Sequence, residues 1–174
     1  MRVLSLPILL IAALAAAPGC GGDDDGEATD EEIIRLDDAS EEVVLTLRDL
    51  VDRGEVVVDD EVAAHLTAPA SGTELSADEP PTFTWSARGS TARHGLTTGE
   101  FVWLNITGPG MDAPIDLVAI ESTSWTVDEE HWELLRGSTG PCEVKVYSAY
   151  VERGLVENDE VFAPTESPTF SVIE

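Results

Sequence analysis

The sequence predicts a mainly β protein: a single antiparallel β-sandwich preceded by a flexible acidic tether and one short amphipathic helix. Three observations lead to this prediction. Short apolar segments with a period of two, separated by Gly- and Pro-containing turns, run from about residue 59 to 174. A stretch with helical periodicity lies before them at 40–53, and an acidic, glycine-containing stretch comes earlier still.

Composition restricts the function classes. The chain has 174 residues, with 35 Asp and Glu against 9 Lys and Arg, and a formal charge of -26. This length suits one domain with a tail, and 43% hydrophobic residues are enough for a core. Because like charges repel, such acidity argues against nucleic acid as a partner. Two cysteines and three histidines are poor material for a metal cluster, and we expect neither a metal nor a cofactor.

Residues 1–19 have the build of an export signal. A positively charged start, Met1-Arg2, precedes the almost wholly apolar run Val3–Ala17. At about 1.5 Å per residue this run spans roughly 22 Å, short of a bilayer core of about 30 Å, and Pro7 interrupts it. The pattern favours a secretory signal peptide over a membrane-spanning helix.

The end of this run, Ala17-Pro18-Gly19-Cys20, resembles the lipobox of bacterial lipoproteins. The resemblance implies that Cys20 is lipidated, begins the mature chain and holds it at a membrane. The sequence departs from the usual pattern at Ala17, where Leu is usual, and at Pro18, so an ordinary cleaved signal with an incidental cysteine is the alternative. Gly21 stands where Asp would imply inner-membrane retention, so the resemblance implies the outer membrane.

Residues 20–38 are predicted to form a flexible, solvated tether. Asp23–Glu42 contains eleven acidic residues and one basic residue, and glycines flank its first three acids. Flexibility and charge repulsion would keep this segment extended. Two other interpretations stay open. An acidic run after a lipidated cysteine resembles a surface-export signal, and carboxylate oxygens suit calcium.

Residues 39–58 are predicted to hold one helix and a connecting segment. Five apolar residues share one face of a helix at 40–53: Val43, Val44, Leu47, Leu50 and Val51. Gly54 is well placed to end this helix. The nearby apolar run Val56–Val58 leaves a strand as the alternative. The opposite face is acidic and would avoid anionic lipid, so the helix is expected to pack on the protein's own domain.

The remaining residues, 59–174, are predicted to form the sandwich. Six segments are expected to be strands: Pro80–Trp85, Glu100–Thr107, Ile115–Ile120, Ser124–Val127, Glu143–Val151 and Thr169–Ile173. A short helical turn is expected at Glu129–Leu135. Alternation along the strands places Phe83 and Trp85 in the core. Val102, Leu104, Val144 and Val146 are expected to face them.

The order of these elements resembles bacterial immunoglobulin-like and fibronectin type III-like domains. Pro69-Ala70-Ser71-Gly72 matches the Pro-x-x-Gly turn after their first strand, and Phe83-Thr84-Trp85 matches the Phe-x-Trp of the second. The resemblance covers about Leu66–Ile173 and implies a single immunoglobulin-like sandwich. The cysteine pair of antibody-type domains is missing, so the core must close by packing alone. Cys142 is expected to be a small buried residue, with a reactive thiol as the alternative.

The same alternation predicts a candidate interaction face. Phe101 and Trp103 lie opposite the core side of one strand, and Lys145 and Tyr147 lie opposite the core side of another. These strands are neighbours in the resembled fold, so the four residues would form one aromatic patch beside a lysine. Such patches suit sugars or peptides. The alternative is that the helix at 40–53 covers this face, which buries both apolar surfaces without a ligand.

No catalytic or metal site is predicted. His65, His94 and His131 lie far apart and share no metal-type spacing, and His131 is expected to have a surface or capping role. No nucleophile elbow, Walker loop or dinucleotide fingerprint occurs. Arg88 and Arg93 join His94 in one basic loop, where internal ion pairs are favoured over an anionic partner.

These features predict an exported, lipid-anchored envelope protein, at the outer membrane, acting as a non-enzymatic module that binds a protein or a glycan. A structural or spacer role without a ligand site is the alternative, and an envelope hydrolase is a remote one. The expected partners are the membrane, through lipid on Cys20, and an envelope protein or glycan. The chain is expected to be a monomer.

Overall fold

The computed structural model describes residues 33–37, 39–87, 91–93 and 96–174, with only the backbone described for 91–93 and 96–97. The predicted signal peptide, Cys20 and most of the predicted tether lie outside these residues. The described residues all fall within one unit, Glu31–Glu174.

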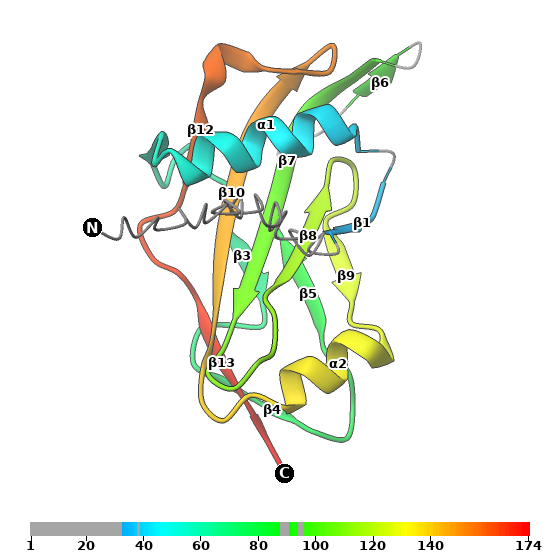
Figure 1. Ribbon diagram of the computed structural model, residues 1–174, viewed down its shortest axis with the longest axis vertical. Helices are drawn as coiled ribbons and strands as arrows, with labels where there is room; N and C mark the ends of the chain where they lie inside the picture. The colour runs from blue at the N-terminus through cyan, green and yellow to red at the C-terminus, as the bar shows by residue number, and fades with distance from the viewer. Residues whose placement is uncertain (1–32, 38, 88–90, 94–95) are drawn as a thin grey trace, which may run out of the picture. The chain divides into compact units, whose positions relative to one another are not determined.

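The structure is mainly β, and its strands form a large and a small sheet (Figure 1). The main path of the large sheet is β1 (Ile33–Arg35), β8 (Ile115–Ala119), β7 (Leu96–Thr107), β10 (Cys142–Glu152), β12 (Val161–Ala163) and β2 (Val56–Val58). Off this path, β6 (Thr91–Arg93) pairs with β7, β11 (Leu155–Val156) pairs with β10, and β13 (Thr169–Ile173) pairs with β10 and with β4 (Thr73–Ser76). The small sheet has the order β3 (Leu66–Ala68), β5 (Thr82–Trp85) and β9 (Ser124–Thr126).

Two α-helices accompany the sheets. The first, α1 (Glu41–Asp52), precedes β2, and the second, α2 (Glu129–Arg136), connects β9 to β10. A short 3-10 turn, η1 (Glu157–Asp159), links β11 to β12. The predictions of a helix at 40–53 and of a helical turn at 129–135 are therefore confirmed.

The first core lies between the two sheets. Phe83 is fully buried and Trp85 is 3% exposed, and both lie in one cluster with the β7 and β10 residues predicted to face them. The ring of Phe83 stacks on Trp125 at 5.9 Å and meets the edge of Phe170 at 5.5 Å. Aromatic pairs at such distances add to the gain from burial. The predicted burial of Phe83 and Trp85 against residues of β7 and β10 is confirmed.

The second core lies between the large sheet and α1, which crosses β7 and β10 in Figure 1. The four buried residues of α1 are Val43, Val44, Leu47 and Leu50. Burying one such side chain stabilises the fold by about 1.5–3 kcal/mol. The result is three layers: α1, the large sheet and the small sheet.

Gly54 ends α1 as predicted. Its φ is 72°, which glycine adopts without a steric penalty. The amide of Gly54 donates to the carbonyl of Val51, and the amide of Glu55 donates to that of Leu50. These two hydrogen bonds are the Schellman pattern that satisfies the last carbonyls of a helix.

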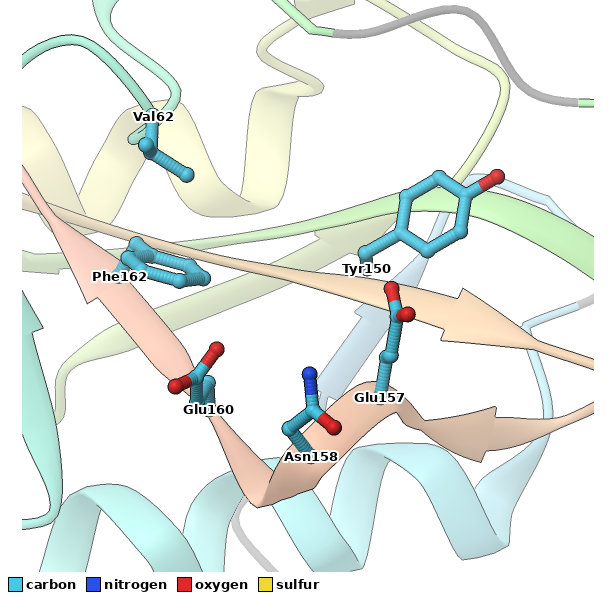
Figure 2. A pocket seen from close by; sticks show the side chains of 6 residues that line it. All are labelled: Val62, Tyr150, Glu157, Asn158, Glu160 and Phe162. Atoms are coloured by element: carbon cyan, nitrogen blue, oxygen red, sulfur yellow. The ribbon is translucent and has the colours of Figure 1, made fainter.

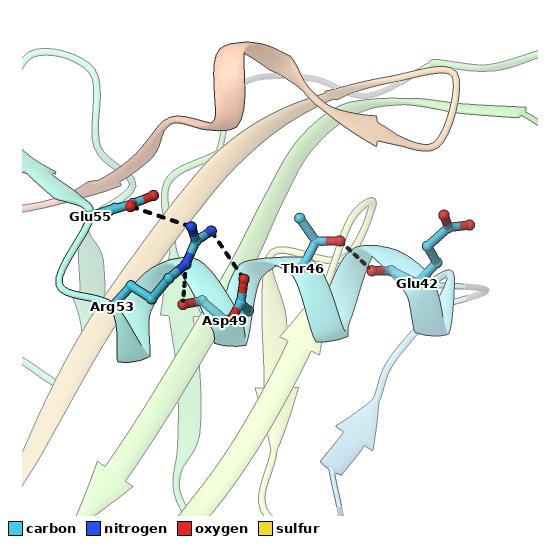
Figure 3. A network of polar contacts seen from close by, with 5 residues as sticks. All are labelled: Glu42, Thr46, Asp49, Arg53 and Glu55. Atoms are coloured by element: carbon cyan, nitrogen blue, oxygen red, sulfur yellow. Dashed lines mark hydrogen bonds and ion pairs between the residues drawn. The ribbon is translucent and has the colours of Figure 1, made fainter.

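The outer face of α1 is polar (Figure 3). Arg53 pairs with Asp49 at 3.0 Å and with Glu55 at 3.4 Å, and the Thr46 hydroxyl donates to the carbonyl of Glu42 at 2.8 Å. All of these side chains are largely exposed or lie at the surface, where ion pairs contribute little. The helix is therefore held by its apolar face.

The predicted tether boundary at residue 38 is wrong. Ile33–Arg35 forms β1, which pairs in parallel with β8 at the edge of the large sheet. The partly buried Ile34 packs against the first core, and Ile33 packs against the second. These two isoleucines inside an otherwise acidic stretch explain why this segment joins the sheet.

The boundary at residue 59 is also too late, because β2 at Val56–Val58 pairs in parallel with β12. The connecting segment therefore contains the strand that was the alternative interpretation. Strands β3, β4, β6, β11 and β12 are not among the six predicted segments. Each has four residues or fewer, which is too short for a period of two to stand out.

Candidate functional site

The predicted interaction face is largely covered by α1. Its two strands are neighbours as expected, and Tyr147 lies opposite Trp103 in the β7–β10 register. However, Phe101 is fully buried and Trp103 is only 8% exposed, and both belong to the second core. The structure therefore agrees with the alternative interpretation, in which the helix and the sheet bury each other.

The polar atoms of this face are satisfied internally. The indole Nε1 of Trp103 donates to Asp116 Oδ1 at 2.7 Å, and Asn105 Nδ2 donates to the same oxygen at 2.8 Å. Asp116 is itself 3% exposed, and buried carboxylates need such partners. This network fixes the Trp103 ring in place and does not offer it to a ligand.

Tyr147 and Lys145 form the remainder of the predicted face. Tyr147 is partly buried, with its ring 5.2 Å from that of Trp103. Burial raises the pKa of Tyr147, and the carboxylates of Glu143, Asp116 and Asp52 raise it further, so the phenol stays neutral. Lys145 is exposed. One partly buried ring and one lysine do not make a large aromatic patch.

Cys142 is fully buried in the first core, and the prediction of a small buried residue is confirmed. Burial raises the pKa of its thiol, and a hydrogen bond with Ser138 only partly opposes this shift. A thiol that stays protonated and enclosed is a poor nucleophile. The other cysteine, Cys20, lies outside the described residues.

His65 and His131, the two histidines that the structure describes, each contact a nearby residue of their own segment. His131 lies in the first turn of α2, whose N-cap is Asp128: the His131 amide donates to the Asp128 carboxylate at 3.0 Å, and the His131 ring Nδ1 lies 2.7 Å from Asp128 Oδ1. The cap of this helix is therefore Asp128, and His131 is the residue that it caps. His65 Nε2 lies 2.8 Å from the carbonyl of Asp60. Arg88 and His94 lie outside the described residues.

Asp37 ties the N-terminal segment to the domain. One carboxylate oxygen accepts the backbone N–H groups of residues 120–122, each at 3.0 Å, and the other accepts the Ser122 hydroxyl at 2.8 Å. Partial burial disfavours the charged form of Asp37, but these hydrogen bonds outweigh it and lower the pKa below its ordinary value of 3.8. The end of the predicted tether is thereby fixed to the loop after β8.

A pocket of about 280 Å³ opens on the other side of the large sheet from α1 (Figure 2). We call it the β10–β12 pocket. It is lined by Val62, Tyr150, Glu157, Asn158, Glu160 and Phe162. Tyr150 and Phe162 are partly exposed, and the two glutamates are exposed. The pocket therefore has an aromatic wall, formed by Tyr150 and Phe162, and an acidic rim, formed by Glu157 and Glu160.

The strand register explains why two aromatic rings meet here. Val144 and Val146 point into the first core, so Tyr150, an even number of residues further along β10, lies on the same face of the sheet. Phe162 is paired with Ser148 of β10 and shares that face. Neither ring belongs to the first or the second core as the described residues define them.

Sequence reasoning missed this pocket. It placed Tyr150 inside the predicted strand Glu143–Val151 but assigned it no role. The available signal was the continued alternation of β10 past Val146, which places an aromatic residue on the core face where the buried pattern ends.

A second pocket, of about 350 Å³, lies close by in sequence and is lined by Asp60, His65, Pro164, Thr165 and Glu166. Its polar groups are used structurally: the Asp60 carboxylate accepts the Thr165 hydroxyl at 2.6 Å and the Thr165 amide at 2.9 Å. These two hydrogen bonds lower the pKa of Asp60. The Asp60 carboxylate therefore connects two loops and is already used by Thr165.

The described residues hold neither a metal-ligand cluster nor a membrane-spanning helix. No three His, Cys, Asp or Glu side chains gather there as metal ligands would. No helix in the described part of the chain has the length and apolar character to span a bilayer. No protein-family model, curated protein or solved structure matches this chain. A functional proposal therefore rests on its own sequence and geometry.

Proposed function

We propose that this chain is an exported, lipid-anchored envelope protein, at the outer membrane, whose β domain is a non-enzymatic interaction module. The anchor is argued from the lipobox-like Ala17–Cys20 and the apolar run before it. The observation that supports an interaction role is the β10–β12 pocket, an open aromatic site in a domain whose other large aromatic face is covered.

We also propose that the domain is immunoglobulin-like. In constant-type members of that family, strands A, B, E and D form one sheet and strands C, F and G form the other. The small sheet β3-β5-β9 corresponds to A, B and E, and β7, β10 and β13 of the large sheet correspond to C, F and G, whereas β8 departs from this layout by pairing with β7. On this proposal α1, β1, β2 and β12 are additions to the large sheet.

The hydrogen bonds of Asp37 to residues 120–122 limit the length of chain between the proposed anchor and the domain. From Cys20 to the start of β1 at Ile33 there are 13 residue steps, which span at most about 45 Å when fully extended. A lipid on Cys20 would therefore hold the domain near the membrane surface. The acidic residues between them would repel anionic headgroups and keep the domain off the bilayer.

A spacer role is the second candidate, and one observation favours it. The aromatic face first predicted to bind a ligand is instead buried by α1. A spacer needs a stable domain at a set distance from the membrane and no ligand site. The two candidates differ in whether the β10–β12 pocket contacts a partner in the envelope.

Lipidation is tested by metabolic labelling with a palmitate analogue, followed by membrane fractionation. We expect Cys20→Ala to lose the label and to leave the membrane fraction, because the thiol is the attachment point. Cys142→Ala is the matched control, since it removes the other cysteine and should keep both label and fractionation. Label retained in Cys20→Ala would overturn the anchor.

The interaction role is tested by photo-crosslinking in intact cells. A photoreactive phenylalanine analogue replaces Tyr150 in the pocket or, as a control, the exposed Glu74 of β4. The two positions lie near opposite ends of β10, since β11 pairs with its last residues and β13, the partner of β4, with its first. Discrete adducts at 150 but not at 74 support the module. Equal patterns at both positions, or none, favour the spacer.

A further inference from the structure

The β10–β12 pocket combines an aromatic wall with an acidic rim. Its wall is apolar, with the rings of Tyr150 and Phe162 beside Val62. Its rim carries the carboxylates of Glu157 and Glu160, and Figure 2 shows these side chains rising from the 157–160 segment toward the two rings. Aromatic faces and carboxylates both attract cations.

Among the residues that the structure describes, no cationic side chain pairs with the rim carboxylates. The ion pairs of Arg53, His131 and Arg136 go to other carboxylates, and none of them reaches Glu157 or Glu160. In the described part of the chain, neither carboxylate takes part in a hydrogen bond; the backbone amide of Glu160 donates to the carbonyl of Glu157 at 3.2 Å. This contrasts with Asp37, Asp60 and Asp128, whose carboxylates all accept hydrogen bonds.

The charge and the size of the β10–β12 pocket restrict the kinds of ligand that it can bind. An anion would meet two carboxylates and a chain of formal charge -26, and a wholly apolar group would strip water from those carboxylates without compensation. A volume of about 280 Å³ lies at the low end for a ligand pocket, which fits one long side chain better than a whole ring-bearing ligand. A lysine or arginine side chain satisfies all three conditions.

We propose that the β10–β12 pocket binds the Lys or Arg side chain of a basic segment in a partner protein. The alkyl stem lies along Tyr150 and Phe162, and the cationic head meets Glu157 and Glu160. This inference rests on the proposed interaction role and gives that role a partner chemistry. The acidity of the whole chain steers a basic partner toward the domain, and the pocket supplies the specific contact.

The test is a binding titration with the full chain in detergent. The probe is a fluorescein-labelled hexapeptide, Gly-Ser-Arg-Arg-Ser-Gly, followed by anisotropy at low ionic strength. Its matched control replaces both arginines by citrulline, which is nearly isosteric and uncharged. We expect saturable binding of the arginine peptide and at least about fivefold weaker binding of the citrulline peptide, because one cation–π and carboxylate contact is worth about 1 kcal/mol or more.

Variants separate the pocket from general acidity. Glu157→Gln with Glu160→Gln removes two rim charges, and Glu74→Gln with Glu79→Gln removes two exposed charges from β4 and the segment that follows it. We expect the rim variant to weaken arginine-peptide binding about fivefold and the control variant to change it less than twofold. Tyr150→Ala should weaken binding by a similar factor without any change in charge.

Two results would overturn the inference: equal losses in the rim and control variants, or no saturable binding of the arginine peptide. Neither result bears on lipidation or on crosslinking at position 150. Adducts at 150 with no arginine binding would leave the interaction role standing and remove only the cationic ligand. Folding of each variant is verified by its urea midpoint, so that a misfolded protein is not scored as a loss of binding.

Discussion

The two faces of β10 differ in what lies against them. On one face, Ala149 and Val151 join Trp103 of the neighbouring strand beneath α1, and this surface is buried. On the other face, the first core takes Val146, but Tyr150 lies beyond it and lines an open pocket. The same alternation therefore produces two aromatic surfaces. The one that α1 covers is buried and stabilises the fold, and the one with Tyr150 stays accessible.

The pattern of one strand therefore does not identify a binding face by itself. Phe101 and Trp103 have the composition of an interaction patch, yet they are buried against α1, and their burial stabilises the packing of that helix. Tyr150 and Phe162 come from strands of unequal length and separate segments of the chain. Their rings are accessible because neither core includes them, as far as the described residues define those cores.

Trp103→Ala gives the largest expected effect. It removes a ring that is 8% exposed, together with the indole donor of Asp116, and leaves a cavity under α1. Such substitutions cost about 3–5 kcal/mol, so urea unfolding should show a large loss of stability. Unchanged stability in Trp103→Ala would mean that the face is open and would restore the original interaction patch.

Asp37→Ala tests whether the tether end belongs to the domain. The substitution leaves the N–H groups of residues 120–122 without their shared acceptor, which is expected to cost about 1–3 kcal/mol. The control is Asp23→Ala in the glycine-rich stretch, which should leave the urea midpoint unchanged. Equal midpoints for both variants would contradict the tie and return residues 33–37 to the tether.

The same tie predicts a pH dependence. Because the pKa of Asp37 is lower in the folded than in the unfolded protein, its contribution is fully present above the unfolded value of about 3.9 and is lost as pH falls through the folded value. In Asp37→Asn, the loss of stability relative to the wild type should be present at pH 7 and shrink below about pH 4. A loss that does not vary with pH would show that the charge of Asp37 contributes nothing.

Tyr150→Ala is expected to destabilise the protein much less than Trp103→Ala. The ring is partly exposed and lies outside both cores, so we expect a loss of roughly 1 kcal/mol or less on urea unfolding. The rim variant Glu157→Gln with Glu160→Gln should leave the urea midpoint nearly unchanged. A loss in Tyr150→Ala as large as that in Trp103→Ala would make the pocket part of the core.

Much of the fold follows from the sequence because its long elements have clear periods. The alternation in Glu143–Val151 correctly assigns Val144 and Val146 to the core, and the helical spacing from Val43 to Leu50 correctly predicts α1. Short elements are less readable. Ile33–Arg35 offers only two apolar residues in an acidic stretch, and its pairing with β8 depends on a contact more than 80 residues away.

The candidate site was not predictable in the same way. The pocket combines Val62, Tyr150 and Phe162, from three segments, with an acidic turn, and their proximity follows from the pairing of β10 with β12. That pairing joins an eleven-residue strand to a three-residue strand, and the short strand carries no recognisable period. The prediction of an interaction face at Phe101 and Trp103 was wrong for a different reason. The strands and the side of the sheet were predicted correctly, but α1 covers that side.

The most direct test of the account is hydroxyl-radical footprinting of the full chain, read by mass spectrometry at single aromatic residues. One experiment reports on both faces of β10 under the same conditions. We expect Tyr150 and Phe162 to be oxidised readily, while Phe101 and Trp103 stay protected until the protein unfolds. Oxidation of Trp103 in the folded protein at the rate of Tyr150 would contradict it.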